Sequence, residues 1–196
     1  MLKFVPTLAS AFLFCVGTLL ATPLTFVTTL TGPNEFPANA SPGFGVATVN
    51  YDPAVHSLRV QVNFLNLLAG VTASHIHCCV SPSAVTPTAG VATTTPTFTG
   101  FPSGVTSGTY DHLFDMTLAS SYNPAFVTAA GSIATAEANL ANGFANGTTY
   151  LNIHTTAFPG GEIRGFLVAA PEPGTFALIG LGLAAAALVR RRSGAN

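Results

Sequence analysis

The chain has 196 residues, of which 48% are hydrophobic and only 7% are charged, and its formal net charge is -1. Disordered chains are poor in apolar residues and rich in charge, so this composition predicts that much of the chain is buried, in a protein core or in lipid. Three of the six basic residues are consecutive, at Arg190, Arg191 and Arg192. No clustered basic surface is left to neutralise phosphates, and we expect no nucleic-acid partner.

Residues 1–21 have the composition of a secretory signal peptide. Lys3 is followed by an uncharged apolar run that continues to Leu20, and the small residue Ala21 ends the segment. A positive start, an apolar centre and a small residue at the cleavage site are the three parts of such a peptide. The sequence therefore predicts export and a mature domain over residues 22–170.

Apolar and polar residues alternate through most of this domain. A period of two is typical of half-buried β-strands, and clusters of Gly, Pro, Asn and Ser separate the candidates. The expected strands are Leu24–Leu30, Gly45–Tyr51, Arg59–Phe64, Ser74–His77, Leu113–Leu118, Tyr150–Thr155 and Glu162–Val168. They predict an all-β fold, an antiparallel β-sandwich with an immunoglobulin-like or superoxide-dismutase-like Greek key.

Two segments depart from the alternation. Residues 82–108 are rich in Pro, Thr and Gly, and we expect a long, partly ordered surface connection there. A stripe with helical spacing predicts one short helix, capped by Ser132, ended by Gly143 or Gly147, and packed across one end of the sandwich. The stripe consists of Ile133, Ala136, Leu140 and Phe144.

Histidines are the residues of this domain best suited to chemistry. His75 and His77 are two residues apart, so both imidazoles point to the same face of a strand. His154 lies on the strand Tyr150–Thr155, on the face opposite to its apolar residues. If these strands are neighbours, the three imidazoles converge and can hold a copper or zinc ion. The alternative is that the histidines bond backbone groups and brace the ends of loops.

Cys78 and Cys79 directly follow the histidine pair. Export favours a disulfide, although adjacent Cα atoms are about 3.8 Å apart across a trans peptide, below the usual lower limit of about 4.4 Å. Such a bond would stiffen a turn. Alternatively, the two thiolates would be soft copper ligands beside the imidazoles, in a Cu(I) site.

Glu162 and Arg164 form a second pair that alternation places on one face. An ion pair at this spacing on an edge strand is usually structural and contributes about 0–1 kcal/mol when it is exposed. We therefore expect no acid–base chemistry from these two residues. Pro159-Gly160-Gly161 is expected to set the turn into their strand.

Five blocks of sequence, in order, resemble the CHRD domain family over residues 24–168. The blocks are LTGPNE at 30–35, GVA at 45–47, VTASHIH at 71–77, YLNIHT at 150–155 and PGGEIRGFL at 159–167. That family is named for chordin and also occurs alone in secreted bacterial proteins. The resemblance implies an extracellular β-sandwich module with no established enzymatic activity.

A more remote similarity is to copper-zinc superoxide dismutase, which has a His-x-His pair, a later strand histidine and a late Gly-rich strand with an arginine. It implies that His75, His77 and His154 match three copper ligands, and that Arg164 matches the arginine that attracts the anionic substrate. No histidine occurs between His77 and His112, so the bridging ligand and the zinc histidines lack counterparts. We therefore do not expect dismutase activity.

Residues 171–196 contain three parts in order: Pro171-Glu172-Pro173, an uncharged run over 175–189, and Arg190-Arg191-Arg192. At about 1.5 Å per residue the run covers about 22 Å of the roughly 30 Å hydrocarbon core, so it forms a transmembrane helix only with help from its flanks. The arginines would hold its end in the cytoplasm.

This order closely resembles the PEP-CTERM sorting signal of Gram-negative bacteria that make exopolysaccharide. The resemblance implies export, a transient stay in the inner membrane, processing by an exosortase, and delivery to the cell surface or extracellular matrix. A permanent single-span anchor is the alternative.

Two functional hypotheses follow. In the first, the chain is a non-enzymatic surface or matrix module that associates with exopolysaccharide or other surface components. In the second, it is an exported copper- or zinc-binding protein that uses His75, His77 and His154, with Cys78 and Cys79 as weaker candidates.

Overall fold

The computed structural model describes residues 23–81 and 87–171, together with the single residues 180 and 190. The predicted signal peptide and all but one residue of the predicted membrane segment 175–189 lie outside this part of the chain. Within it, no helix is both long and apolar enough to cross a membrane.

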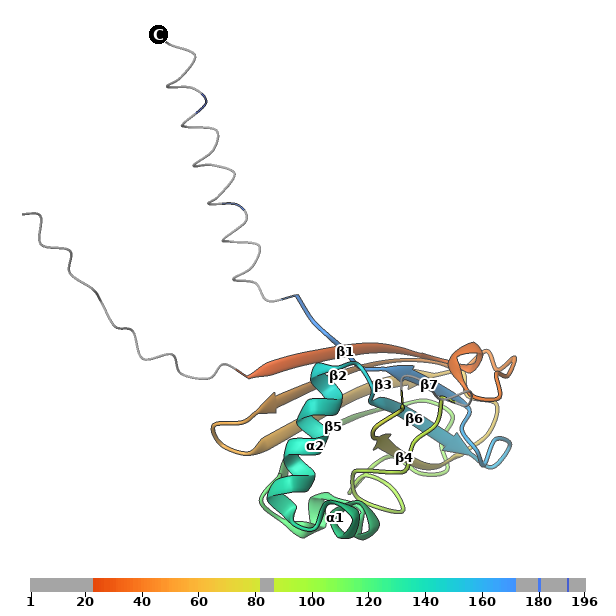
Figure 1. The fold of residues 1–196 in the computed structure, drawn as a ribbon. Coiled ribbons are helices and arrows are strands. Elements are labelled where there is room, and N and C mark those ends of the chain that lie inside the picture. Colours follow the sequence, from red (N-terminus) through yellow and green to blue (C-terminus); the bar gives the residue numbers. More distant parts are fainter. Residues whose placement is uncertain (1–22, 82–86, 172–179, 181–189, 191–196) are drawn as a thin grey trace, which may run out of the picture.

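Eight antiparallel strands form one sheet that curls around the core, in the order β4-β6-β7-β1-β2-β3-β5, with β8 paired to β1 (Figure 1). The strands are β1 (Leu24–Thr31), β2 (Phe44–Asp52), β3 (Ser57–Leu65), β4 (Val71–His77), β5 (Gly108–Asp115), β6 (Tyr150–Thr155), β7 (Ile163–Phe166) and β8 (Val168–Ala169). Buried residues such as Leu30, Val60 and Ile153 line the concave side of the sheet.

The structure has one curled sheet, whereas the predicted sandwich has two separate sheets. β1, β2, β3 and β5 form one half and β4, β6 and β7 the other, and the pair Thr31–Arg164 joins β1 to β7. The alternation of residues predicts which side chains are buried, but it carries no information on which strands meet at the edge of a layer. The antiparallel, mainly β character of the fold is confirmed.

Most strand predictions are confirmed, and Tyr150–Thr155 has the predicted bounds. The strand predicted at 113–118 is wrong, because β5 runs from Gly108 to Asp115. Asp115 ends it: its Oδ1 accepts hydrogen bonds from the backbone N–H and the hydroxyl of Thr117, at 2.9 and 2.6 Å. This local turn competes with the ladder and stops the strand.

Two α-helices cover one end of the sheet, where one was predicted (Figure 1). The predicted helix is α2 (Ile133–Ala145), which begins after Ser132, whose hydroxyl accepts from the N–H of Thr135. Its Phe144 ring stacks on Phe26, with the centroids 5.0 Å apart. Two 3-10 turns, Gly32–Asn34 and Ala119–Ser121, complete the elements described.

The additional helix is α1 (Pro124–Ala130), which is too short to show a hydrophobic period in the sequence. Its local signals are an N-cap and a stop. The Asn123 side chain accepts from the N–H of Ala125, and Pro124 occupies the first turn. Gly131, at φ 84°, takes the left-handed conformation that separates α1 from α2.

The expected surface connection 82–108 is mostly exposed or half-buried where the structure describes it, but a few of its residues enter the core. Phe98 is 0% exposed and its ring stacks on Tyr110 at 5.7 Å. The segment also hydrogen-bonds to β4, through the N–H of Ala92 to the carbonyl of Ile76 and the N–H of Phe98 to the carbonyl of Ser74. Pro and Gly exclude a regular strand, but the free edge of β4 still takes backbone partners from this segment.

Candidate metal centre

β4 and β6 are neighbours, which is the condition on which the metal hypothesis depends. The register pairs His75 with Asn152. Ile76 and Ile153 are 0% exposed and point into the core. Because neighbouring residues of a strand point to opposite faces, the histidines of both strands occupy the other face.

The three imidazoles His75, His77 and His154 converge on this face. Each offers one ring nitrogen, and these nitrogens all lie within 4.8 Å of one another. The Nε2 atoms of His75 and His154 are 3.0 Å apart. The ring centroids of His75 and His77 are 4.7 Å apart, as are those of His75 and His154. The convergence expected from the sequence is therefore present in the structure.

Backbone carbonyls hold the Nδ1 atom of every histidine in this triad. The contacts are His75 Nδ1 to Pro96 O at 3.3 Å, His77 Nδ1 to Ala89 O at 2.7 Å and His154 Nδ1 to Pro159 O at 2.9 Å. A carbonyl oxygen only accepts, so Nδ1 carries the hydrogen and Nε2 presents a lone pair. Contacts of this kind fix the tautomer and orientation of metal-binding histidines.

Burial keeps the triad neutral. It lowers the pKa of His75 to about 3, with smaller contributions from the neighbouring His77 and His154. Burial is also the main cause that lowers the pKa of His77 and of His154. Since the neutral imidazole is the form that binds a metal, the three ligands are available at neutral pH.

Two buried acceptors beside this cluster lack a donor. Nε2 of His77 and Oδ1 of Asn152 are buried and have no hydrogen-bond partner within the described part of the chain. A buried acceptor without a partner is costly, and lone pairs that face each other repel. A cation among the Nε2 atoms would give His77 Nε2 a partner and would relieve the repulsion between the lone pairs, so the arrangement has the chemistry of a metal site.

Cys78 and Cys79 form a disulfide in the structure, which is one of the two alternatives drawn from the sequence. Their sulfur atoms face α2 and lie 3.8 and 3.6 Å from the carbonyl oxygen of Asn139. Within the described residues, the group of converging ligands around β4 and β6 contains the three histidines and no cysteine. A metal bound there would have a three-histidine site.

Arg164 lies on β7, next to the strand that carries His154, and other protein groups bury its side chain. Its Nε donates to the carbonyl oxygen of Asn34, and its Nη1 donates to that of Pro87 at 3.0 Å. The Nε atom is also 3.7 Å from the carboxylate of Glu35, and the guanidinium lies over the Tyr150 ring at 4.8 Å. Because Arg164 is only 3% exposed, it is not presented to an anion in solution.

The structural ion pair of Glu162 and Arg164 on an edge strand, which the alternation suggested, is not formed among the described residues. β7 lies between β6 and β1, and Glu162, directly before its first residue, is 0% exposed. Glu162 accepts three hydrogen bonds of 2.6 Å from other segments of the chain. The donors are the hydroxyl of Ser41, the N–H of Leu68 and the hydroxyl of Thr155. Connections distant in sequence cover this strand, which a local pattern does not reveal.

Glu35 should make the stability of the domain depend on pH. Burial raises its pKa from 4.5 to about 7, although Arg164 acts in the opposite direction. Between about pH 4.5 and 7 the folded state keeps a proton that the unfolded chain has lost, so this group makes stability fall as pH rises. Glu35→Gln should remove a dependence of about 2–3 kcal/mol across that window.

Urea unfolding at several pH values between 4.5 and 7.5 measures this effect as the difference between variant and wild type. Asp111→Asn is the matched control, because Arg59 lowers the pKa of that exposed carboxyl, whose ionisation therefore falls below the window. A difference between Glu35→Gln and wild type that stays constant with pH would contradict the prediction.

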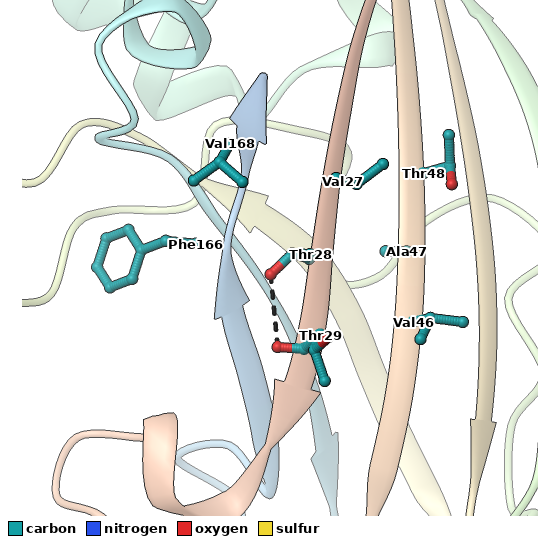
Figure 2. Close-up of a pocket in the computed structure, with 8 residues that line it drawn as sticks. All are labelled: Val27, Thr28, Thr29, Val46, Ala47, Thr48, Phe166 and Val168. Atoms are coloured by element: carbon teal, nitrogen blue, oxygen red, sulfur yellow. Dashed lines mark hydrogen bonds between the residues drawn. The ribbon is translucent and has the colours of Figure 1, made fainter. Parts of the chain in front are cut away.

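A hollow of about 410 Å³ lies on the outer face of the sheet, where β1 and β2 meet the C-terminal strand (Figure 2). Its lining consists of Val27, Thr28, Thr29, Val46, Ala47, Thr48, Phe166 and Val168. Figure 2 shows Phe166 and Val168 on one side of β1, with Val46, Ala47 and Thr48 on the neighbouring strand β2. No lining side chain is ionisable, so this surface offers contacts but neither acid–base nor metal chemistry.

Two family models match the sequence. The model described as CHRD domain matches residues 26–167, and the model described as PEP-CTERM protein-sorting motif matches residues 169–192. No curated protein and no solved structure matches the chain. The comparisons confirm the two family resemblances seen in the sequence blocks and give no support to the remote similarity to superoxide dismutase.

Proposed function

The chain belongs to the CHRD domain family and ends in a PEP-CTERM sorting motif, and from this premise we propose that it is a non-enzymatic surface module whose domain binds one transition-metal ion. The sorting motif implies export to the cell surface and processing by an exosortase. The observation that carries the metal-binding part is the convergence of three neutral imidazoles, each with its Nδ1 held by a backbone carbonyl.

Copper or zinc fits this ligand set, because both bind neutral imidazole nitrogen. Around a tetrahedral ion with bonds of about 2.0–2.1 Å, ligand nitrogens are about 3.4 Å apart. The Nε2 atoms of His75 and His154 are 3.0 Å apart, and all three ligand nitrogens lie within 4.8 Å. Small rotations of the rings would therefore bring them to metal-binding distance.

The surroundings of the site favour binding without turnover. Attraction of a small anion to a metal needs a cationic side chain with free donors near the open position. Here the Arg164 guanidinium is buried against Glu35 and two backbone carbonyls. We therefore assign the metal a structural or storage role in a module that associates with exopolysaccharide or other surface components.

Calorimetric titration of the full-length protein in detergent, after chelator treatment, tests metal binding directly. We expect one copper or zinc ion per chain, with a Kd of about 1 μM or tighter for wild type. His75→Ala/His77→Ala should abolish this uptake. His112→Ala is the matched control, because His112 lies on β5 with its ring against Tyr110 and Phe114. No uptake by wild type, or equal uptake by the double variant, would refute metal binding.

A further inference from the structure

A second hollow of about 410 Å³ lies between α2 and the disulfide. It is lined by Cys79, Phe126, Asn139, Asn142, Gly143, Asn146 and Thr148. With Cys79 in a disulfide, no lining side chain carries or gains a charge. Its volume falls in the range typical of small-molecule sites.

Three asparagines line this hollow. Asn139, Asn142 and Asn146 are spaced three and four residues apart, so they share one face of α2 and its C-terminal end. All three are exposed, and their side-chain amides make no hydrogen bond within the described residues. Asn is less favourable than Ala in a helix by about 0.7 kcal/mol. Asn146 is the C-cap of α2, so this cost applies to Asn139 and Asn142 alone. The amides of all three offer paired donors and acceptors to a ligand in the hollow.

Apolar groups also line the hollow. Phe126 of α1 contributes a half-buried aromatic ring, and the disulfide contributes sulfur. Gly143 allows this packing, because a Cβ there would lie 2.6 Å from the Cys78 sulfur and 2.7 Å from the Cys79 sulfur. Apolar groups beside neutral amides match a sugar ring, whose C–H face packs on apolar atoms while its hydroxyls pair with amides.

The lining argues against other ligand classes. An acidic polymer would meet no cation, since no Lys, Arg or His lines the hollow. A peptide that adds to a sheet needs a strand edge, and the lining comes from helices and connections. We propose that this hollow binds one neutral sugar residue of a surface polysaccharide. The proposal rests on the surface-module part of the proposed function and is independent of the metal centre.

Saturation-transfer NMR on the full-length protein in a sugar-free detergent tests the site. The probes are glucose, galactose, mannose, N-acetylglucosamine and their disaccharides, with oligogalacturonate as an acidic probe. Wild type should bind at least one neutral sugar with a Kd of about 1 mM. Asn142→Ala and Phe126→Ala should each weaken binding about tenfold. Asn63→Ala, an exposed position on β3, should leave it unchanged.

Copper titration of the same samples separates the two proposals. Variants that bind copper like wild type but have lost the sugar are folded, and the loss then belongs to the hollow. Three results would overturn the sugar site: no binding of any neutral probe, binding of oligogalacturonate alone, or equal binding by Asn142→Ala. A wild-type protein that binds copper but no sugar contradicts this site and leaves the metal centre standing.

Discussion

Glu162→Ala is expected to destabilise the domain by about 4 kcal/mol. The carboxylate is 0% exposed and accepts three hydrogen bonds of 2.6 Å. Removing it leaves the Leu68 N–H and the hydroxyls of Ser41 and Thr155 without their buried acceptor, and each such loss costs about 1–3 kcal/mol. These donors come from the β1–β2 connection, the β3–β4 connection and β6, so the variant loosens three segments at once. Urea unfolding measures the change.

Two variants separate this role from a general loss of charge. Glu162→Gln keeps one acceptor oxygen, and the Thr155 hydroxyl can turn to accept from the new amide, so its effect should be smaller. Asp111→Ala also removes a carboxylate with short contacts, at 2.8 and 2.6 Å from the Arg59 guanidinium, but on an exposed surface. Its expected effect is below about 1 kcal/mol. An equal loss of stability in Asp111→Ala and Glu162→Ala would contradict the role of Glu162 as a buried hydrogen-bond acceptor.

Local alternation predicted the strands and the shared face of the histidines, because side-chain direction along a strand follows from spacing alone. His75 and His77 lie on one face and Ile76 on the other, as expected. The pairing of β6 with β4, which brings His154 to the other two histidines, does not follow from the sequence pattern and is established by the structure.

What the sequence did not predict depends on contacts between distant segments. The outer face of β6 and β7 reads as polar and therefore as solvent-exposed, yet Asn152 is 2% and Arg164 is 3% exposed. Carbonyls from two connections, at Asn34 and Pro87, bond Arg164 there. Those connections contain Pro and Gly, which predict irregular backbone. The same residues do not predict which part of the sheet the connection will cover. The same limit explains Phe98, buried in a segment expected at the surface.

Bound copper or zinc should stabilise the folded domain strongly, by about 4 kcal/mol when the free ion exceeds its Kd about 1,000-fold. The gain follows from mass action, since the unfolded chain does not hold the three imidazoles together. Thermal or urea unfolding with and without metal measures it. His75→Ala/His77→Ala should show no gain, whereas His112→Ala should gain as much as wild type. An equal gain of stability in the double variant would show that the metal does not bind at His75 and His77.

Lowering the pH should reduce the stability of the metal-free protein, whereas it should have a smaller effect on the affinity for metal. The folded pKa of His75 is lowered to about 3, below its ordinary value of 6.5. Below about pH 6.5 the unfolded chain therefore binds a proton that the folded state refuses, and this group costs about 1.4 kcal/mol of stability per pH unit as pH falls. The lowered pKa values of His77 and His154 act in the same direction.

The same shifts protect metal binding from proton competition. An exposed cluster of three ordinary imidazoles would lose affinity by about 1,000-fold between pH 7.5 and 5.5, because each ring would be protonated about 90% of the time. In the folded apo domain His75 stays neutral over this range and the pKa values of His77 and His154 are lowered, so the affinity should fall by less than about 100-fold. Calorimetry at both pH values decides between these cases. Metal release with a midpoint near pH 6.5 would show that the three rings titrate as solvated histidines, and that burial does not preorganise the site.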